Sequence, residues 1–158
     1  KLEVISRSKE SCTDEASTEL VISEFLEKYD CEYLILVQAT NVFLKKGDLD
    51  KAIKKLIDNK DTIDSLLSVV KTKYLIWRDT NEGLISFNYD YENRPRSQSI
   101  TKIEYIENGA FYIFKRENFL KYKNRLHGKI GFYEMTKDSL FEIDDPEDLI
   151  DVEKLLKN

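Results

Sequence analysis

The sequence predicts an α/β protein, because helical and strand-like patterns alternate along most of its 158 residues. The helical stretches repeat apolar residues at helical spacing and open on residues that cap helices. The strand-like stretches are short, continuous apolar runs, typical of strands covered on both faces. Apolar residues make up 41% of the chain and charged residues 35%, an ordinary balance for a domain with one hydrophobic core.

The first part of the chain predicts two helices and two buried strands. The pair Ser17-Thr18 is placed to cap a helix, and residues 33–37 then predict a central parallel strand. Asp48 is placed to cap a second helix that runs to about residue 59, and residues 65–70 predict another buried strand. We assign residues 1–70 to the core of one α/β domain.

Residues 71–105 interrupt this rhythm. Strand signals at residues 74–77 and 84–87 flank a turn at residues 81–83, and a polar stretch follows. We expect a hairpin that leaves the main sheet. A two-stranded ribbon is only marginally stable in water unless something packs on it, so a second subunit is the natural partner.

The α/β pattern then resumes and completes the same domain over residues 106–158. Its elements are a strand at residues 110–114, a helix at 116–123, a strand at 130–134 and an extended segment at 141–144. Asp145 is placed to cap a final helix that has Pro146 in its first turn.

Composition excludes several classes of function. The net charge of −5, with both signs interspersed, argues against general nucleic-acid binding. No apolar run approaches the roughly 18 residues that a membrane span needs. Cys12 and Cys31 share no metal-ligand spacing and form no disulfide framework, so we interpret them as reduced thiols of a cytoplasmic protein. The chain opens without Met or a signal-peptide pattern, as expected for a truncated or processed product.

Two polar stretches carry candidate binding residues. Gln38 follows the strand at residues 33–37, and ligands of open α/β sheets bind beyond the carboxyl ends of strands. Arg94 and Arg96 lie in an extended stretch stiffened by Pro95, and a guanidinium group recognises carboxylate or phosphate bidentately. The simpler alternatives are a side chain that satisfies loop backbone groups and a solvated basic patch.

Two further stretches suggest a close backbone approach and a metal site. Gly109 lies in a polar turn before an aromatic strand, where we expect a positive φ or a close contact, or else a plain turn. In a strand, Glu142 and Asp144 share one face and suit Mg²⁺, which also takes phosphate oxygens. The alternative is an acidic helix cap, a role that fits Asp145 and Asp148 better.

In this order, the motifs resemble those of CMP-sialic acid synthetases, also called acylneuraminate cytidylyltransferases. The family pattern has Leu-Gln-Ala/Pro-Thr-Ser at a strand end, Arg-Pro-Arg-Arg-Gln in a hairpin, Glu-Asn-Gly-Ala-Phe-Tyr, and Asp-Ile-Asp followed by Asp-Leu. These motifs correspond here to residues 36–41, 94–98, 107–112 and 142–149. Residues 14–18 also resemble the family's Asp-x-Ala-Ser-Thr. The resemblance covers nearly the whole chain.

The resemblance implies a Rossmann-like nucleotidyltransferase fold, a three-layer sandwich whose protruding hairpin reaches over the partner's active site in a homodimer. It implies a reaction of CTP with a nine-carbon, sialic acid-like 2-keto sugar acid, giving the CMP-sugar and pyrophosphate with Mg²⁺. The implied metal ligands are Glu142 and Asp144. The implied substrate-binding residues are Gln38, Arg96 (from the partner, to the sugar carboxylate), Gln98, Asn108 and Tyr112.

The chain departs from the family pattern in ways that affect the sugar more than the reaction class. Glu142, Ser97 and Asn41 stand where the family has Asp, Arg and Ser, and Ile76 replaces a basic residue before the hairpin Trp. The family's N-terminal strand and its Gly-Ser-Lys-Gly-type loop, which cradles the CTP phosphates, have no counterpart here. We therefore expect this chain alone to be an inactive fragment, which a pyrophosphate-release assay would check.

Three alternatives stay open at this point. The chain could be a non-catalytic dimerisation or binding module that retains the fold. It could also belong to a cytidylyltransferase for legionaminic, pseudaminic or 3-deoxy-octulosonic acid. Another nucleotidyltransferase or glycosyltransferase with an acidic metal motif would leave the arginine hairpin and the Asn108-Gly109 turn unexplained.

Overall fold

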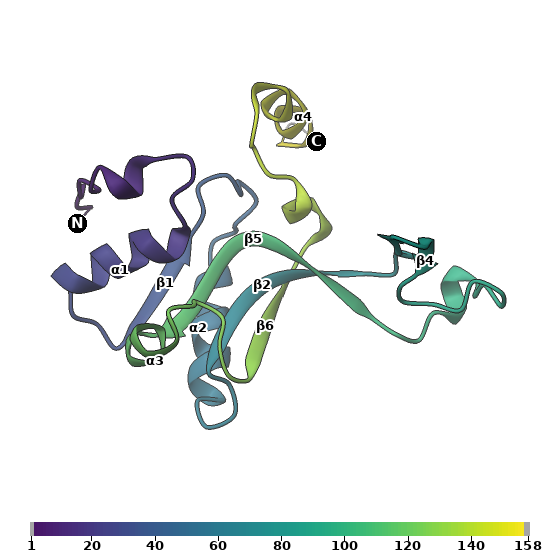
Figure 1. Ribbon diagram of the computed structural model, residues 1–158, viewed down its shortest axis with the longest axis horizontal. Helices are drawn as coiled ribbons and strands as arrows, with labels where there is room; N and C mark the ends of the chain where they lie inside the picture. Colours follow the sequence, from purple (N-terminus) through teal and green to yellow (C-terminus); the bar gives the residue numbers. More distant parts are fainter. Residues whose placement is uncertain (1, 157–158) are drawn as a thin grey trace.

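The computed structural model describes residues 2–156, except for the side chain of Ser97. Within these residues, four strands form one sheet in the order β1-β5-β2-β6 (Figure 1). The strands are β1 (Tyr33–Val37), β2 (Ser65–Thr72), β5 (Glu104–Lys115) and β6 (Ile130–Met135). β5 runs antiparallel to both β1 and β2, whereas β2 and β6 are parallel.

Helices cover both faces of the sheet, which confirms the three-layer α/β fold. On one face lie α1 (Thr18–Lys28) and α3 (Arg116–Tyr122), and on the other lies α2 (Asp48–Asp58). The core on the α1 side is built from Ile22, Leu26, Tyr112, Phe114 and Phe119. The core on the α2 side is built from Ala52, Leu56, Leu66, Val70, Ala110, Phe111, Ile113 and Met135.

The helix caps confirm one prediction and correct another. Ser17 caps α1, because its hydroxyl accepts a 3.2 Å hydrogen bond from the Leu20 amide. The N-cap of α2 is Gly47, at φ 88°, and not Asp48. Asp48 is the first helical residue, and its carboxylate accepts hydrogen bonds from the Lys45 amide and the Tyr133 hydroxyl.

The prediction that residues 33–37 form a central parallel strand is wrong. β1 lies at an edge of the sheet formed by the described residues, and its one neighbour, β5, is antiparallel. Ile35 and Val37 are 36% and 44% exposed as a result. An apolar run shows that a strand is buried or half-buried, but the run carries no information about which strand pairs with it or in which direction.

β5 is the longest strand of the sheet and bends in its middle. It covers 12 residues, so it begins well before the predicted start at residue 110. Its register with β2 shifts between Leu67 and Val69, and Gly109 adopts φ 63° beside this shift. The bend separates the part of β5 in the core from the part that continues toward the hairpin region (Figure 1).

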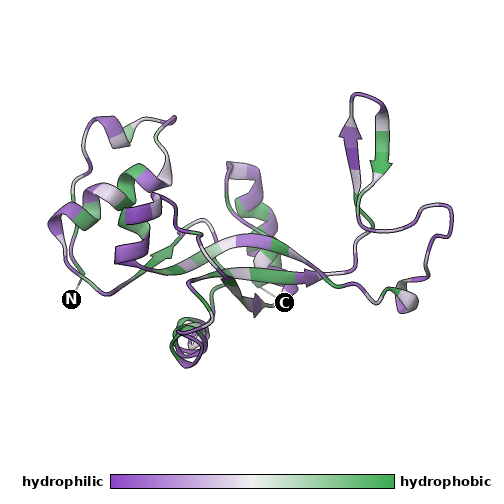
Figure 2. Cartoon of the chain, turned by 60° about the horizontal axis from the view of Figure 1, so that its bottom comes forward, coloured by the Kyte–Doolittle hydropathy of each residue, from purple (hydrophilic) through white to green (hydrophobic). Residues whose placement is uncertain are grey.

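The predicted hairpin is present and stands apart from the main sheet (Figure 2), but its first strand begins only at Trp77, where the strand predicted at residues 74–77 ends. It consists of β3 (Trp77–Thr80) and β4 (Gly83–Ser86), and the short 3-10 helix η2 (Ser97–Ser99) follows. Large apolar side chains on this segment remain exposed, among them Trp77, Leu84, Ile85 and Phe87. We call residues 71–105 the excursion; its limits against the core remain a prediction.

The chain ends in a polar connection and a helix. The 3-10 helix η3 (Lys137–Leu140) follows β6, and α4 (Pro146–Leu156) closes the described chain, while η1 (Glu10–Cys12) lies near its start. Asp145 caps α4 as predicted, since its carboxylate accepts hydrogen bonds from the amides of Glu147 and Asp148. Residues 141–144, however, form an extended connection rather than a strand, because they pair with no sheet strand.

Two predictions from composition can be checked on the described residues. Cys12 and Cys31 are both free thiols. No helix within residues 2–156 has the length and apolar character needed to cross a membrane.

Candidate functional site

The end of β1 is held against the bend of β5. The Gln38 amide donates a 3.1 Å hydrogen bond to the Ala110 carbonyl, one residue past the last paired position of β1. The Gln38 side chain is half-buried. Gln38 therefore lies where β1 ends and β5 changes direction, next to Gly109.

Gly109 brings Gln38 and Glu142 together. A Cβ atom at position 109 would lie 2.3 Å from Glu142 Oε1 and 3.2 Å from Gln38 Oε1. The backbone here also has φ 63°, a conformation that side chains disfavour. Both expectations for Gly109 are confirmed, and the carboxylate and the amide converge on the half-buried backbone of Gly109.

A buried hydrogen-bond cluster fixes this arrangement from behind. The Asn41 side-chain amide donates 2.8 Å hydrogen bonds to the carbonyls of Asn108 and Ser139. The Asn108 amide in turn donates a 2.8 Å bond to the Ser139 hydroxyl. The Ile143 amide bonds to the Thr40 carbonyl at 3.0 Å, which ties the segment after η3 to the loop after β1.

Negative charge is concentrated around Glu142. Partial burial, the charge of Asp144 and the charge of Glu107 raise the pKa of Glu142, while a hydrogen bond from Asn41 lowers it. Among residues 2–156, no three or more His, Cys, Asp or Glu side chains are arranged as a complete metal site. Glu142 and Asp144 offer carboxylate oxygens, the hard donors that Mg²⁺ prefers, and the Gln38 amide oxygen lies beside Glu142 at Gly109.

Comparison with known proteins identifies the family of this fold and site. A family model described as "Cytidylyltransferase" matches residues 1–158. The chain belongs to the cytidylyltransferase family.

Two relatives and one solved structure illustrate the relationship. An N-acylneuraminate cytidylyltransferase of Streptococcus agalactiae serotype V is 26% identical over 153 residues, which cover 96% of this chain and 37% of the relative. The enzyme of the same name from Escherichia coli O18:K1:H7 is 28% identical over 144 residues, covering 88% of this chain and 33% of the relative. The chain therefore spans about a third of the length of these relatives.

The solved structure supports the fold alone. The 4-diphosphocytidyl-2C-methyl-D-erythritol synthase of Anaerococcus prevotii superposes with a TM-score of 0.61 at 14% identity. The match covers 91% of this chain and 68% of that chain.

Tyr112 of the cytidylyltransferase chain is buried in the core on the α1 side of the sheet. Its ring is buried, its hydroxyl donates to the Glu107 carboxylate, and the Arg125 guanidinium lies 4.5 Å from the ring centroid. Arg125 also forms an ion pair with Glu19 of α1. Burial, and then the bond to Glu107, raise the pKa of Tyr112 to about 12.

Asn108 is also buried, and its position bears on its predicted role. Its side-chain nitrogen is occupied by Ser139 Oγ and Met135 Sδ, while its Oδ1 atom is buried without a partner among the described residues. In this arrangement Asn108 holds the bend of β5 in place. A direct contact with a substrate, as the family resemblance implies, remains a prediction.

Within one chain, Arg96 and Gln98 do not lie at the site formed by Gln38 and Glu142. Both are exposed and lie at η2, at the far end of the excursion from β1 (Figure 1). Glu142, Gln38 and the Asn108–Gly109 bend, by contrast, lie together at the core.

Sequence reasoning missed three parts of the site. Asn41 was noted only as a departure from a motif, and Glu107 only as part of a turn. Arg125 carried no signal at all, because a single basic residue after a helix is common on any surface. Their roles depend on contacts that local patterns do not reveal, such as the bond from Asn41 to the Asn108 carbonyl and the ion pair of Arg125 with Glu19.

Proposed function

We propose that this chain forms the acceptor-sugar part of a cytidylyltransferase that activates a nine-carbon, sialic acid-like 2-keto sugar acid with CTP. The products are the CMP-sugar and pyrophosphate. The proposal rests on the family of the chain and on the printed names of its relatives, which are N-acylneuraminate cytidylyltransferases.

The observation that carries the proposal is the convergence at Gly109. The Gln38 amide oxygen and the Glu142 carboxylate both face the bare backbone of Gly109, which leaves a polar surface at the carboxyl end of β1. A sugar acid offers many hydroxyl groups, and an amide together with a carboxylate can accept and donate hydrogen bonds to them. We assign Gln38 to the sugar and Glu142 with Asp144 to the cation.

Mg²⁺ would screen the charge of the triphosphate when bound at Glu142 and Asp144. Two features of the chain favour a cation at Glu142 and Asp144. Burial and neighbouring carboxylates destabilise the ionised form of Glu142, and a cation bound beside it would relieve that repulsion. The Asn41 hydrogen bonds hold the segment after η3, which places Glu142 over Gly109.

We assign the substrate carboxylate to Arg96 and a neighbouring contact to Gln98, both supplied by the partner in a homodimer. Two observations support this arrangement. Arg96 is exposed beside η2, and the excursion that carries η2 extends away from β1 (Figure 1), so Arg96 can serve a second chain's site more readily than its own. The excursion also exposes an apolar surface, with Leu84 at 66% and Phe87 at 50%, that a second copy would cover.

The decisive experiment measures CMP-sugar formation and pyrophosphate release by the natural protein, with N-acetylneuraminic acid and related 2-keto sugar acids. Glu142→Gln and Asp144→Asn keep the side-chain shapes and should each lower kcat/KM by at least about 100-fold. Asp151→Asn, an exposed change on α4, is the matched control and should leave activity unchanged. Full activity in the double variant Glu142→Gln/Asp144→Asn would refute the assignment.

A further inference from the structure

The register shift of β5 places Glu107 and Tyr112 on the same face of the sheet. Tyr112 pairs with Leu67 of β2, and Glu107 pairs with Val69. Leu67 and Val69 are two residues apart, so their side chains point to one face, and the residues paired with them share that face. Without the shift, the separation of 5 positions between Glu107 and Tyr112 would put them on opposite faces. The face is the one that α1 covers, because Leu67 and Tyr112 pack in that core.

The phenol of Tyr112 is committed to Glu107. Its hydroxyl donates a hydrogen bond to Glu107 Oε1. Within residues 2–156, no other group donates a hydrogen bond to this carboxylate, and no cation forms an ion pair with it. The Glu107 side chain is exposed. Its second carboxylate oxygen is therefore free to accept a hydrogen bond from a ligand.

Arg125 fixes the Tyr112 ring from another segment of the chain. Its guanidinium lies 4.5 Å from the ring centroid and forms an ion pair with Glu19 of α1. The side chains of Arg125 and Glu19 are only 23% and 28% exposed. Because the ring is also buried in the core, its hydroxyl is held in one direction and orients the Glu107 carboxylate before any ligand binds.

Glu107 lies beside the site proposed for the sugar and the cation. It comes two residues before Gly109, whose backbone faces Gln38 Oε1 and Glu142 Oε1. The negative charge of Glu107 is close enough to raise the pKa of Glu142. In the described part of the chain, Glu107 does not join Glu142 and Asp144 in a group of three metal-ligating side chains. Its carboxylate is therefore available to a substrate rather than to the cation.

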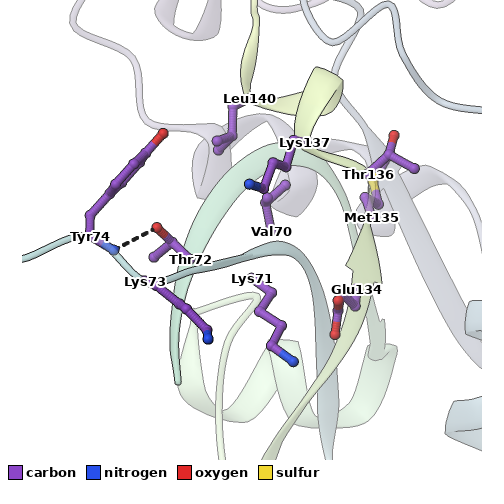
Figure 3. A pocket seen from close by; sticks show the side chains of 10 residues that line it. All are labelled: Val70, Lys71, Thr72, Lys73, Tyr74, Glu134, Met135, Thr136, Lys137 and Leu140. Carbon is purple, nitrogen blue, oxygen red and sulfur yellow. Dashed lines mark hydrogen bonds between the residues drawn. The ribbon is translucent and has the colours of Figure 1, made fainter. Parts of the chain in front are cut away.

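Glu134 occupies the matching position on the other side of β2. Val69 pairs with Glu107 on β5 and with Glu134 on β6, so the two carboxylates lie on one face of the sheet with β2 between them. Lys71 and Lys73 extend to the same side as Glu134 (Figure 3). Glu134 is exposed like Glu107, but the Tyr112 hydroxyl bonds to Glu107 alone of the two. The pair therefore offers a matched comparison of an oriented carboxylate with an ordinary one.

We propose that Glu107 accepts a hydrogen bond from a hydroxyl group of the acceptor sugar, and that Tyr112 and Arg125 act through it as positioning residues. This inference rests on the proposed function. A carboxylate only accepts hydrogen bonds, and it binds a hydroxyl group more strongly than a neutral acceptor does. It also repels the carboxylate of the sugar acid, which we assign to the partner's Arg96. Glu107 thus selects a hydroxyl-bearing part of the substrate.

The test measures the dissociation constant of N-acetylneuraminic acid for the natural protein by isothermal titration calorimetry. CDP and Mg²⁺ are present throughout, because CDP fills the place of CTP but cannot yield pyrophosphate. Glu107→Ala should raise the dissociation constant by at least about tenfold, since a charge-assisted hydrogen bond is lost. Glu134→Ala makes the same change on the same face and should leave it unchanged. Both residues are exposed, so both variants should keep the far-UV circular dichroism of the natural protein.

Tyr112→Phe separates a positioning role from direct contact with the sugar. It keeps the ring, its packing in the core and its contact with Arg125, and it removes only the donor to Glu107. We expect a rise of a few-fold in the dissociation constant, because the carboxylate is no longer held in one orientation. In a Glu107→Ala background, Tyr112→Phe should cause no further rise. An equal rise in both backgrounds would show that the phenol does not act through Glu107.

Failure of this inference is distinguishable from failure of the proposed function, because binding is measured without turnover. Sugar binding that depends on Glu107, in a protein that forms no CMP-sugar from CTP, would refute the proposed reaction alone. Formation of CMP-sugar with unchanged sugar affinity in Glu107→Ala would overturn the assignment of Glu107 alone. Equal losses of affinity in Glu107→Ala and Glu134→Ala, or no saturable binding by the natural protein, would overturn it as well.

Discussion

The side-chain amide of Asn41 donates 2.8 Å hydrogen bonds to the main-chain carbonyls of both Asn108 and Ser139. These carbonyls belong to the bend of β5 and to η3, while Asn41 follows β1. One buried amide thus fixes three segments that are far apart in the sequence. The position of Glu142 over Gly109 follows from this cluster, because the segment after η3 is held against the loop after β1.

We expect Asn41→Ala to lower the free energy of unfolding by about 2–4 kcal/mol, because two buried carbonyl groups lose their donor. Urea denaturation followed by circular dichroism measures the change. Asn59→Ala removes an exposed amide that bonds to the Lys55 carbonyl at the end of α2, and it should cost about 1 kcal/mol or less. Equal losses of unfolding free energy in the two variants would show that the buried hydrogen bonds of Asn41 contribute no more than an exposed one.

Gly109→Ala should lower the free energy of unfolding more than an ordinary glycine-to-alanine replacement at positive φ does. The strained backbone alone costs about 1–2 kcal/mol, and the new Cβ would also displace Glu142, whose Oε1 lies 2.3 Å away. Gly47→Ala is the control, since its φ is 88° but nothing lies within 4 Å of its Cβ.

A double-mutant cycle isolates the contact with Glu142. In a Glu142→Ala background, the loss of unfolding free energy caused by Gly109→Ala should fall toward that of Gly47→Ala, with the remainder due to Gln38 Oε1 at 3.2 Å. An unchanged loss in that background would mean that Glu142 does not lie over Gly109.

Titration of Glu142 should be linked to stability with a defined sign. Burial, Asp144 and Glu107 raise the pKa of Glu142 in the folded state. The folded protein therefore holds this proton more tightly than the unfolded chain, so the contribution to stability is present at low pH. It is lost as pH rises from the ordinary value of about 4.3 through the folded pKa.

Carboxyl-detected NMR gives the pKa of Glu142 directly. Asp144→Asn should lower it by removing a nearby negative charge, and added Mg²⁺ should lower it further because the cation competes with the proton. Asp151→Asn, on the exposed face of α4, should leave it unchanged. A Glu142 pKa at or below the ordinary glutamate range would contradict the placement among carboxylates.

The sequence was sufficient to predict features that depend on residues close together in the chain, such as the helix caps. Ser17 caps α1 and Asp145 caps α4 because each carboxylate or hydroxyl acts on amides two or three residues away. The family resemblance implied that Gln38 and Glu142 serve one site, and the structure brings the two side chains together at Gly109. The edge position of β1 did not, since pairing is decided by segments far along the chain, such as β5.

The remaining misses have the same physical origin. The predicted strand at residues 141–144 is a connection, because its backbone bonds to the loop after β1 through Ile143 and Thr40 instead of to a sheet edge. Glu107 reads as a turn residue in the sequence. It becomes a hydrogen-bond acceptor for Tyr112 because β5 bends between the two residues.

Association through the excursion should be visible in the fluorescence of Trp77, the single tryptophan of the chain. Trp77 is 43% exposed beside Tyr89 and Tyr91. If a second copy covers it, its emission shifts to shorter wavelength as concentration rises, together with a doubled mass in light scattering. Leu84→Asp should raise the dimer dissociation constant by at least about tenfold.

The control for this association is Ile57→Asp, an exposed apolar residue of α2 outside the excursion. It should leave the dissociation constant unchanged. If the protein stays monomeric with unshifted Trp77 emission up to high micromolar concentration, the assignment of the partner's Arg96 to the substrate carboxylate is wrong.

The most direct measurement of the central claim uses Mn²⁺ as a paramagnetic substitute for Mg²⁺ in the presence of CTP and the natural protein. Amide signals of Gln38, Gly109, Glu142 and Asp144 should broaden first, because these residues surround one cation. In Glu142→Gln/Asp144→Asn that broadening should disappear. Broadening centred on another acidic surface, or unchanged in the double variant, would contradict the site.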